Sequence, residues 1–194
     1  MPGGFANATA SDQQPCPCGG GSYGRCCAPM HRGERQAPTA EQLMRSRYSA
    51  FVRGEVDYLL ATHPEPGLPV ARRRRELQRS CRQLRWLGLT IREVRAGGPQ
   101  DLEGIVRFEA RHQGGVLRET SLFQRRDGRS DGAWLYIRAT EDPLGWHDIG
   151  NILERFGVNI VLLQRRQAIG WRGGTPRALA TPGWQTAPCT VFRP

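Results

Sequence analysis

The chain contains no lysine, so all 28 of its basic residues are arginine. It also lacks any apolar run of about 18 residues, the length that crosses a membrane. Residues 1–14 hold neither the basic nor the apolar region of a secretory signal peptide. No Ser-His-Asp set, phosphate-binding loop or dinucleotide fingerprint is present. We therefore expect a cytoplasmic protein that neither spans a membrane nor carries a recognisable catalytic motif.

The net charge of +10 is unevenly distributed. Arg72–Arg85 contains seven arginines and one glutamate, a local charge of +6 (seven minus one). Such a basic segment favours association with nucleic acid. However, the absence of lysine, together with 24 glycines and 14 prolines, is more simply explained by a GC-rich genome. Nucleic-acid binding through this segment is therefore the weaker interpretation.

Four of the six cysteines fall within twelve residues, as the pairs Cys16/Cys18 and Cys26/Cys27 around a glycine-rich loop. Zinc takes four thiolate ligands at about 2.3 Å in a tetrahedron, which such a loop can supply. So short a hairpin buries little apolar surface, and metal binding would supply folding free energy on the order of 10 kcal/mol. Two disulfides are the alternative and would require an oxidising compartment. We predict zinc bound by Cys16, Cys18, Cys26 and Cys27, with His31 as an alternative ligand.

This cysteine segment resembles the zinc motif C-P-C-G-S-G-x-x-Y-x-x-C-[CH] of the bacterial preprotein translocase ATPase, the SEC-C motif. Tyr23 stands three residues before Cys26, as in that motif, although the loop between the cysteine pairs is one residue shorter. In the ATPase the motif docks onto a chaperone and onto ribosomes. The resemblance therefore implies a docking role, with a protein partner or the ribosome meeting an exposed edge formed by Tyr23, Gly24 and Arg25.

Further segments extend the resemblance to the bacterial YchJ family. They are His31–Gly33, Leu43–Val52 and Asp57–Pro64, and residues 44–52 are the most specific of them. The family implies a SEC-C-like zinc motif joined to a nuclear transport factor 2-like (NTF2-like) domain, a cone-shaped α+β structure. The resemblance runs from about Cys16 to Ile137. It implies an architecture and a metal but no reaction.

The residue pattern divides the chain into four parts. We predict a disordered segment at 1–14, the zinc motif at 15–33, the NTF2-like domain at 38–139 and a tail at 140–194. The tail contains a candidate helix at 148–167 and is otherwise expected to be disordered.

Three helices are predicted at the start of the domain. A capping box at Thr39–Gln42 begins the first helix, and Gly54 is placed to end it. The second helix is predicted over Val56–Thr62, and the third over Arg72–Gln83. On the third helix an apolar stripe is separate from a basic face made of Arg72, Arg75, Arg79 and Arg82.

From Trp86 onward the apolar residues alternate, which indicates strands. Leu87, Leu89 and Ile91 are expected to share a face, and three similar segments follow, separated by glycine-containing turns. Helices followed by four antiparallel strands predict an α+β domain whose helices cover one face of a curved sheet.

A pocket is expected between the helices and the sheet of a cone-shaped fold. Strand alternation makes Glu119 and His112 the candidates for acid–base catalysis there, with the pKa of Glu119 raised by burial. The favoured interpretation of Glu119 is an ion pair with Arg45 or Arg47, and that of His63 is a loop or cap residue. A zinc adaptor is thus favoured over two alternatives, a small enzyme using Glu119 or His112 and an RNA-associated module using the basic face.

Overall fold

The computed structural model describes residues 10–140, so predictions for residues 1–9 and for the tail, including the helix at 148–167, lie outside the described residues. The helical elements are α1 (Ala10–Gln13), η1 (Tyr23–Arg25), α2 (Ala28–His31), α3 (Ala40–Arg53), α4 (Val56–Ala61), α5 (Val70–Gln83) and η2 (Arg126–Gly128). The strands are β1 (Trp86–Ala96), β2 (Glu103–His112), β3 (Gly115–Arg125) and β4 (Trp134–Thr140).

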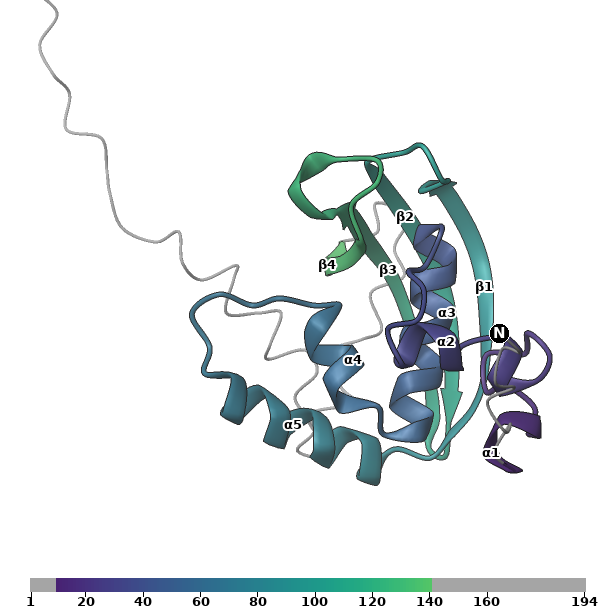
Figure 1. The fold of residues 1–194 in the computed structure, drawn as a ribbon. Helices are drawn as coiled ribbons and strands as arrows, with labels where there is room; N and C mark the ends of the chain where they lie inside the picture. The colour runs from purple at the N-terminus through teal and green to yellow at the C-terminus, as the bar shows by residue number, and fades with distance from the viewer. Residues whose placement is uncertain (1–9, 141–194) are drawn as a thin grey trace, which may run out of the picture.

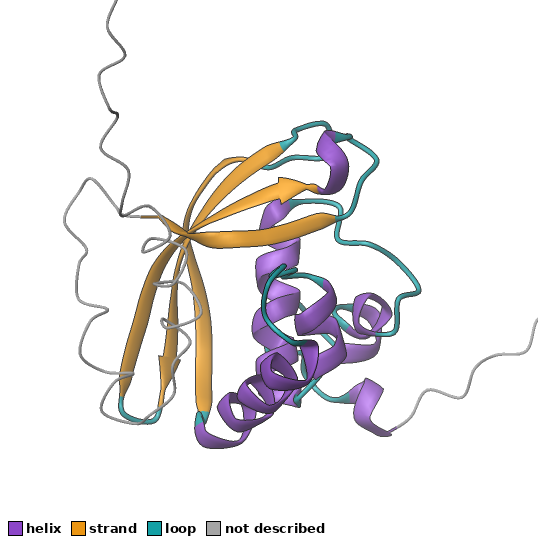
Figure 2. Cartoon of the chain, turned by 90° about the vertical axis from the view of Figure 1, so that its left-hand side faces the viewer, coloured by secondary structure: helices purple, strands orange, loops and turns teal. Residues whose placement is uncertain are grey.

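The four strands form one antiparallel sheet in the order β1-β2-β3-β4. Helix α3 lies across this sheet, and α4 and α5 extend from one end of it (Figure 1). Figure 2 shows the curved strands on one side and the long helices on the other. The prediction of an α+β domain with helices on one face of a curved sheet is therefore confirmed. None of the helices within residues 10–140 is long and apolar enough to span a membrane.

The predicted helix boundaries rest on local chemistry that the structure shows. Thr39 Oγ1 accepts a hydrogen bond from the backbone N–H of Gln42 at 3.1 Å, which caps the start of α3. Gly54 ends α3 in the left-handed conformation with φ of 76°. Helix α5 begins at Val70, two residues before the prediction, because Pro69 can precede a first helical turn without losing a hydrogen bond.

Two expectations differ from the structure. Ordered structure begins inside the segment predicted to be disordered, since α1 at Ala10–Gln13 is fixed by a 2.5 Å ion pair between Asp12 and Arg32. Leu87 is 58% exposed and does not share the face of Leu89. A register shift between Trp86 and Gly88 explains this, because one extra residue in a strand moves the next side chain to the other face.

The apolar core joins α3, the sheet and the cysteine segment. Leu43 and Tyr48 of α3 belong to the same buried cluster as Phe108 and Phe123 of the sheet. The cluster also contains residues of the cysteine segment, namely Cys16, Cys18, Tyr23, Cys27, Ala28 and Met30. The cysteine segment is therefore part of the domain core and not a separate appendage.

A substitution at Gly104 tests the close backbone contact between Gly104 and Gly97 in the core. We expect Gly104→Ala to destabilise the fold by about 1–3 kcal/mol, because the added Cβ would lie 2.5 Å from Gly97 Cα and 3.0 Å from Ala40 Cβ. The melting temperature should fall by about 5 °C or more. Gly98→Ala is the control, since its Cβ would approach only Asp101, at 3.4 Å. Equal melting temperatures for the two variants would contradict the expectation.

Candidate metal centre

The cysteine segment, residues 15–33, folds into a compact knuckle. Pro15 and Ser22 form an isolated antiparallel bridge, and the N–H of Cys16 donates to Gly21 O at 2.6 Å. Gly19 and Gly21 have φ of 85° and 92°, a left-handed conformation that glycine adopts without strain. The chain then passes through η1, and Cys27 precedes α2 as its N-cap residue. The loop thereby returns the second cysteine pair to the first.

The four sulfur atoms lie at the corners of a small tetrahedron. The Sγ atom of Cys18 is 3.5 Å from that of Cys16, 3.4 Å from that of Cys26 and 3.6 Å from that of Cys27. The Cys26 and Cys27 Sγ atoms are 3.7 Å apart, and all four lie within 4.8 Å of one another. Tetrahedral ligands at about 2.3 Å from an ion are about 3.8 Å apart, so the thiols fit a bound metal ion.

This spacing does not favour the disulfide alternative. A disulfide brings two sulfur atoms to about 2.05 Å, and each cysteine then has one bonded partner. Here the four cysteines are free thiols, and Cys18 lies at nearly equal distances from the other three. A set of four similar separations is typical of a shared central ion.

The buried thiols shift one another's pKa values in opposite directions. Hydrogen bonds from Cys18 and Cys27 lower the pKa of Cys16, whereas burial raises the pKa of Cys26 to about 12. The hydrogen bond with Cys16 also raises the pKa of Cys27. A bound cation would supply the charge that makes all four thiolates stable together.

The knuckle packs against α3 at two buried serines. Cys16 Sγ lies 3.7 Å from Ser49 Oγ, and His31 Nε2 lies 2.9 Å from the carbonyl oxygen of Ser46. Ser46 and Ser49 are both fully buried. In addition, Arg45 Nη1 donates to Cys18 O at 3.3 Å. The small serine side chains allow the knuckle to approach α3 closely, and Figure 1 shows α2 beside this helix.

His31, the alternative ligand, has both ring nitrogens in other hydrogen bonds. A carbonyl oxygen can only accept, so Nε2 carries the proton that it donates to Ser46 O. Burial lowers the pKa of His31, and its Nδ1 is hydrogen-bonded with the Tyr23 hydroxyl oxygen at 2.8 Å. His31 is therefore oriented toward the helix and Tyr23, outside the group of four thiols.

The expected docking edge is only partly exposed. Tyr23 is buried, its hydroxyl lies 3.2 Å from Glu55 Oε1, and the Arg53 guanidinium lies 3.7 Å above its ring. The prediction that Tyr23 is exposed is therefore wrong, because its ring lies buried between the knuckle and the domain. Arg25 and the loop glycines 19–21 are exposed and form what we call the knuckle edge.

The remaining predicted residues lie away from the knuckle. Arg72, Arg75, Arg79 and Arg82 are all exposed on α5, so the basic face is present. Sequence reasoning missed Arg73, which is buried and pairs with Glu65 at 2.8 Å. His63 lies in the loop after α4, as predicted, but it also lines a cavity together with Glu119. Its position directly before Pro64 gave no signal of this.

Glu119 and His112 are both buried but differ in surroundings. The ion pair predicted for Glu119 is wrong, because Arg45 pairs with Glu41 and Arg47 Nη1 donates to Leu59 O and Thr62 Oγ1. Glu119 Oε1 instead accepts from two hydroxyl groups, those of Ser121 and Tyr136. His112 packs edge-on against Trp86, with 5.8 Å between the ring centroids.

Gly20 offers a direct test of the sulfur arrangement. An added Cβ at Gly20 would lie 2.7 Å from Cys26 Sγ, so Gly20→Ala should weaken metal binding at least tenfold in a competition assay with a chelator. Gly24→Ala is the matched control, because its Cβ would lie equally close, at 2.7 Å, to Asp12 instead of a thiol. Equal losses of metal affinity in both variants would contradict a site-specific effect.

The knuckle and the domain together define a class of protein, a four-cysteine SEC-C-type knuckle joined to an NTF2-like domain. Residues 39–139 match the family described as YchJ, middle NTF2-like domain. The chain belongs to this family.

Relatives and solved structures agree with this assignment. The UPF0225 protein of Corynebacterium efficiens is 48% identical over 125 residues, covering 62% of this chain and 88% of that protein. The UPF0225 protein of Streptomyces coelicolor is 45% identical over 123 residues, covering 63% and 91%. The solution structure of a SEC-C motif containing protein from Rhodopseudomonas palustris has a TM-score of 0.53 and 29% identity, covering 66% and 99%. The crystal structure of a SEC-C motif containing protein from Psychrobacter arcticus has a TM-score of 0.54 and 25% identity, covering 68% and 86%.

Proposed function

We propose that this protein is a cytoplasmic zinc-binding adaptor, in which the ion has a structural role and the knuckle docks a macromolecular partner. The mutual spacing of the four sulfur atoms carries the metal part of the proposal. Four protein thiolates complete a tetrahedral shell and leave no position for water or substrate, which is typical of structural zinc. A cytoplasmic location fits this chemistry, because thiols stay reduced there.

The structural role follows from where the knuckle lies. Cys16, Cys18 and Cys27 are buried in the core cluster that also contains Leu43 of α3. Zinc held by these residues would fix the knuckle against the helix, and its loss would remove part of the core. The zinc therefore stabilises the domain as well as the loop that surrounds it.

Metal content tests the first half of the proposal. Full-length protein purified without chelator should contain about one zinc per chain by mass spectrometry of the metal, and Cys26→Ser should lose it. Chelator should lower the melting temperature by more than about 5 °C, since the knuckle shares the core. Cys81→Ser is the control, because Cys81 lies half-buried on α5 and outside the group of four. Disulfides among the four cysteines of freshly isolated protein would overturn the zinc assignment.

The docking half rests on the knuckle edge. Residues 19–21 and Arg25 are exposed, while Cys16, Cys18 and His31 contact α3 on the other side of the knuckle. The resemblance to the translocase motif supports a protein partner or the ribosome. With a net charge of +10, the chain favours a partner with an acidic surface.

Photo-crosslinking in cells tests docking directly. A photo-crosslinking residue at position 25 should yield one dominant partner, identified by mass spectrometry, and Cys26→Ser should abolish that product. The control position is Arg129, which is exposed and lies in the turn between β3 and β4. Identical products from positions 25 and 129 would contradict docking through the knuckle edge.

The basic face of α5 supports a second candidate function, association with RNA. Binding to ribosomes can distinguish this candidate from docking through the knuckle edge. If RNA binds to the basic face, the triple variant Arg72→Gln, Arg75→Gln, Arg79→Gln should weaken co-sedimentation with ribosomes, while Arg25→Glu should not. Removing one arginine–phosphate interaction should reduce the slope of log affinity against log salt by about one. If the protein docks through the knuckle edge, Arg25→Glu should weaken co-sedimentation with ribosomes and the triple variant should not.

A further inference from the structure

A cavity lies between α3, α5 and the sheet, on the side of α3 away from the knuckle. Its volume is about 90 Å³, enough for several water molecules or one small organic molecule. Aromatic rings make up much of its wall, those of Tyr48, Phe51, Trp86, Phe108 and Tyr136. Such a concave, mainly apolar cavity with a few polar groups is typical of a small-molecule site.

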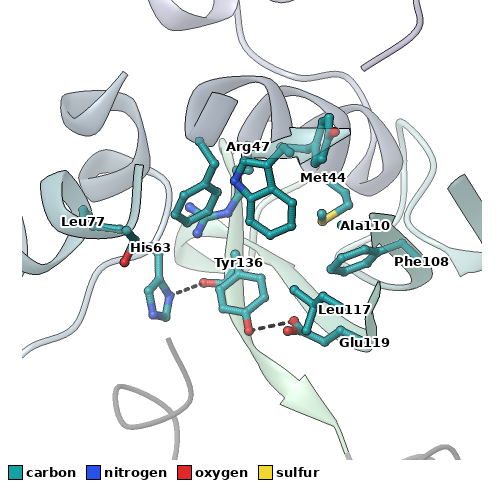
Figure 3. A pocket seen from close by; sticks show the side chains of 13 residues that line it. Met44, Arg47, His63, Leu77, Phe108, Ala110, Leu117, Glu119 and Tyr136 are labelled. Carbon is teal, nitrogen blue, oxygen red and sulfur yellow. Dashed lines mark hydrogen bonds between the residues drawn. The ribbon is translucent and has the colours of Figure 1, made fainter. Parts of the chain in front are cut away.

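The polar part of the cavity centres on Glu119. Figure 3 shows the Glu119 carboxyl group beside the Tyr136 hydroxyl, which donates to Oε1 at 3.0 Å. Ser121 Oγ donates to the same oxygen at 2.5 Å. Within residues 10–140 no donor reaches Oε2, which leaves this oxygen for a ligand. Burial raises the pKa of Glu119, although the hydrogen bonds from Ser121 and Tyr136 oppose the shift.

The cationic side chains of the wall already have hydrogen-bond partners within the protein. The guanidinium of Arg47 lies 4.9 Å from the Tyr136 ring centre and donates to α4, as described above. His63 Nδ1 donates to Tyr136 O at 2.9 Å, visible in Figure 3, and Nε2 lies 3.5 Å from Glu65. Arg73 binds the second oxygen of Glu65 at 2.8 Å. An anionic ligand would therefore find no free cation among the described residues of the wall, and burial raises the pKa of Glu119 and so favours its neutral form, so a neutral ligand suits the cavity better.

Trp86 places an indole ring in the wall of the cavity, where its N–H signal can report on a bound molecule. It lines the cavity, and its Nε1 atom is buried with no acceptor among the described residues. A buried indole N–H without an acceptor loses stability, and most such groups in proteins are hydrogen-bonded.

We propose that this cavity binds a small neutral molecule with a compact aromatic or branched apolar body and one hydroxyl group, which hydrogen-bonds to Glu119. The aromatic walls bind the apolar body, and the carboxyl group fixes its orientation. This site is distinct from the metal centre and from the knuckle edge. If the cavity bound no such molecule, the adaptor proposal would be unaffected.

Four probes of similar shape test the ligand class. Phenol, toluene, benzoate and benzylamine are titrated into the full-length protein, and nitrogen-15 correlation spectra follow the indole N–H signals. Trp86→Phe identifies the signal of Trp86. We expect phenol to shift this signal saturably, and to bind about tenfold more tightly than toluene because of one hydrogen bond. Benzoate and benzylamine should bind more weakly than phenol.

Two variants locate the site. Glu119→Ala should abolish the preference for phenol over toluene, while Ala110→Leu should weaken the binding of both by narrowing the cavity and leaves the Glu119 side chain in place. Leu122→Phe, on the opposite face of β3, is the control and should bind normally. If Glu119→Ala does not fold, Ala110→Leu still decides whether the probes occupy the cavity. The proposal would be overturned if toluene bound as tightly as phenol, or if benzoate or benzylamine bound more tightly than phenol. It would also be overturned if millimolar phenol caused no saturable shift.

Discussion

The close packing of the four-thiol knuckle against α3 is the contact on which the rest of the structure depends. Ser46 and Ser49 are fully buried and small, so that Cys16 and His31 can reach the helix directly. A short hairpin could not hold this position by apolar burial alone, and the proposed ion supplies the missing free energy. In return, the knuckle covers a face of α3 that would otherwise expose serine hydroxyls and backbone to water.

Helix α3 separates the knuckle from the cavity. Successive helical residues are about 100° apart, so Ser46 and Ser49 lie on one side, and Met44, Arg47, Tyr48 and Phe51 lie on the other. The second group lines the cavity. This double burial explains why α3 has so few exposed positions, and why Arg47 must find its hydrogen-bond partners in Leu59 and Thr62. One helix thus supports both proposed sites.

Much of this arrangement could be predicted from the sequence. The capping signal at Thr39, the terminator Gly54 and the alternation around Glu119 act through neighbours in the chain, and the structure has them where the pattern indicates. The predictions that failed concern contacts between residues far apart in the sequence. Tyr23 belongs to the motif, but its burial depends on Arg53 and Glu55, about thirty residues away. Likewise, the ion pair expected for Glu119 did not form, because carbonyl and hydroxyl groups of α4 and its C-cap already satisfy Arg47.

The shared helix gives the two proposed sites a physical route for communication. Loss of the ion would release the knuckle from Ser46 and Ser49, and α3 would then be free to shift or fray on its other side as well. A ligand in the cavity contacts that side and would hold α3 in place. If metal and ligand both favour the same position of the helix, each must strengthen the binding of the other by the same factor, because coupling free energies are reciprocal. The zinc would then set the affinity of the cavity without touching it.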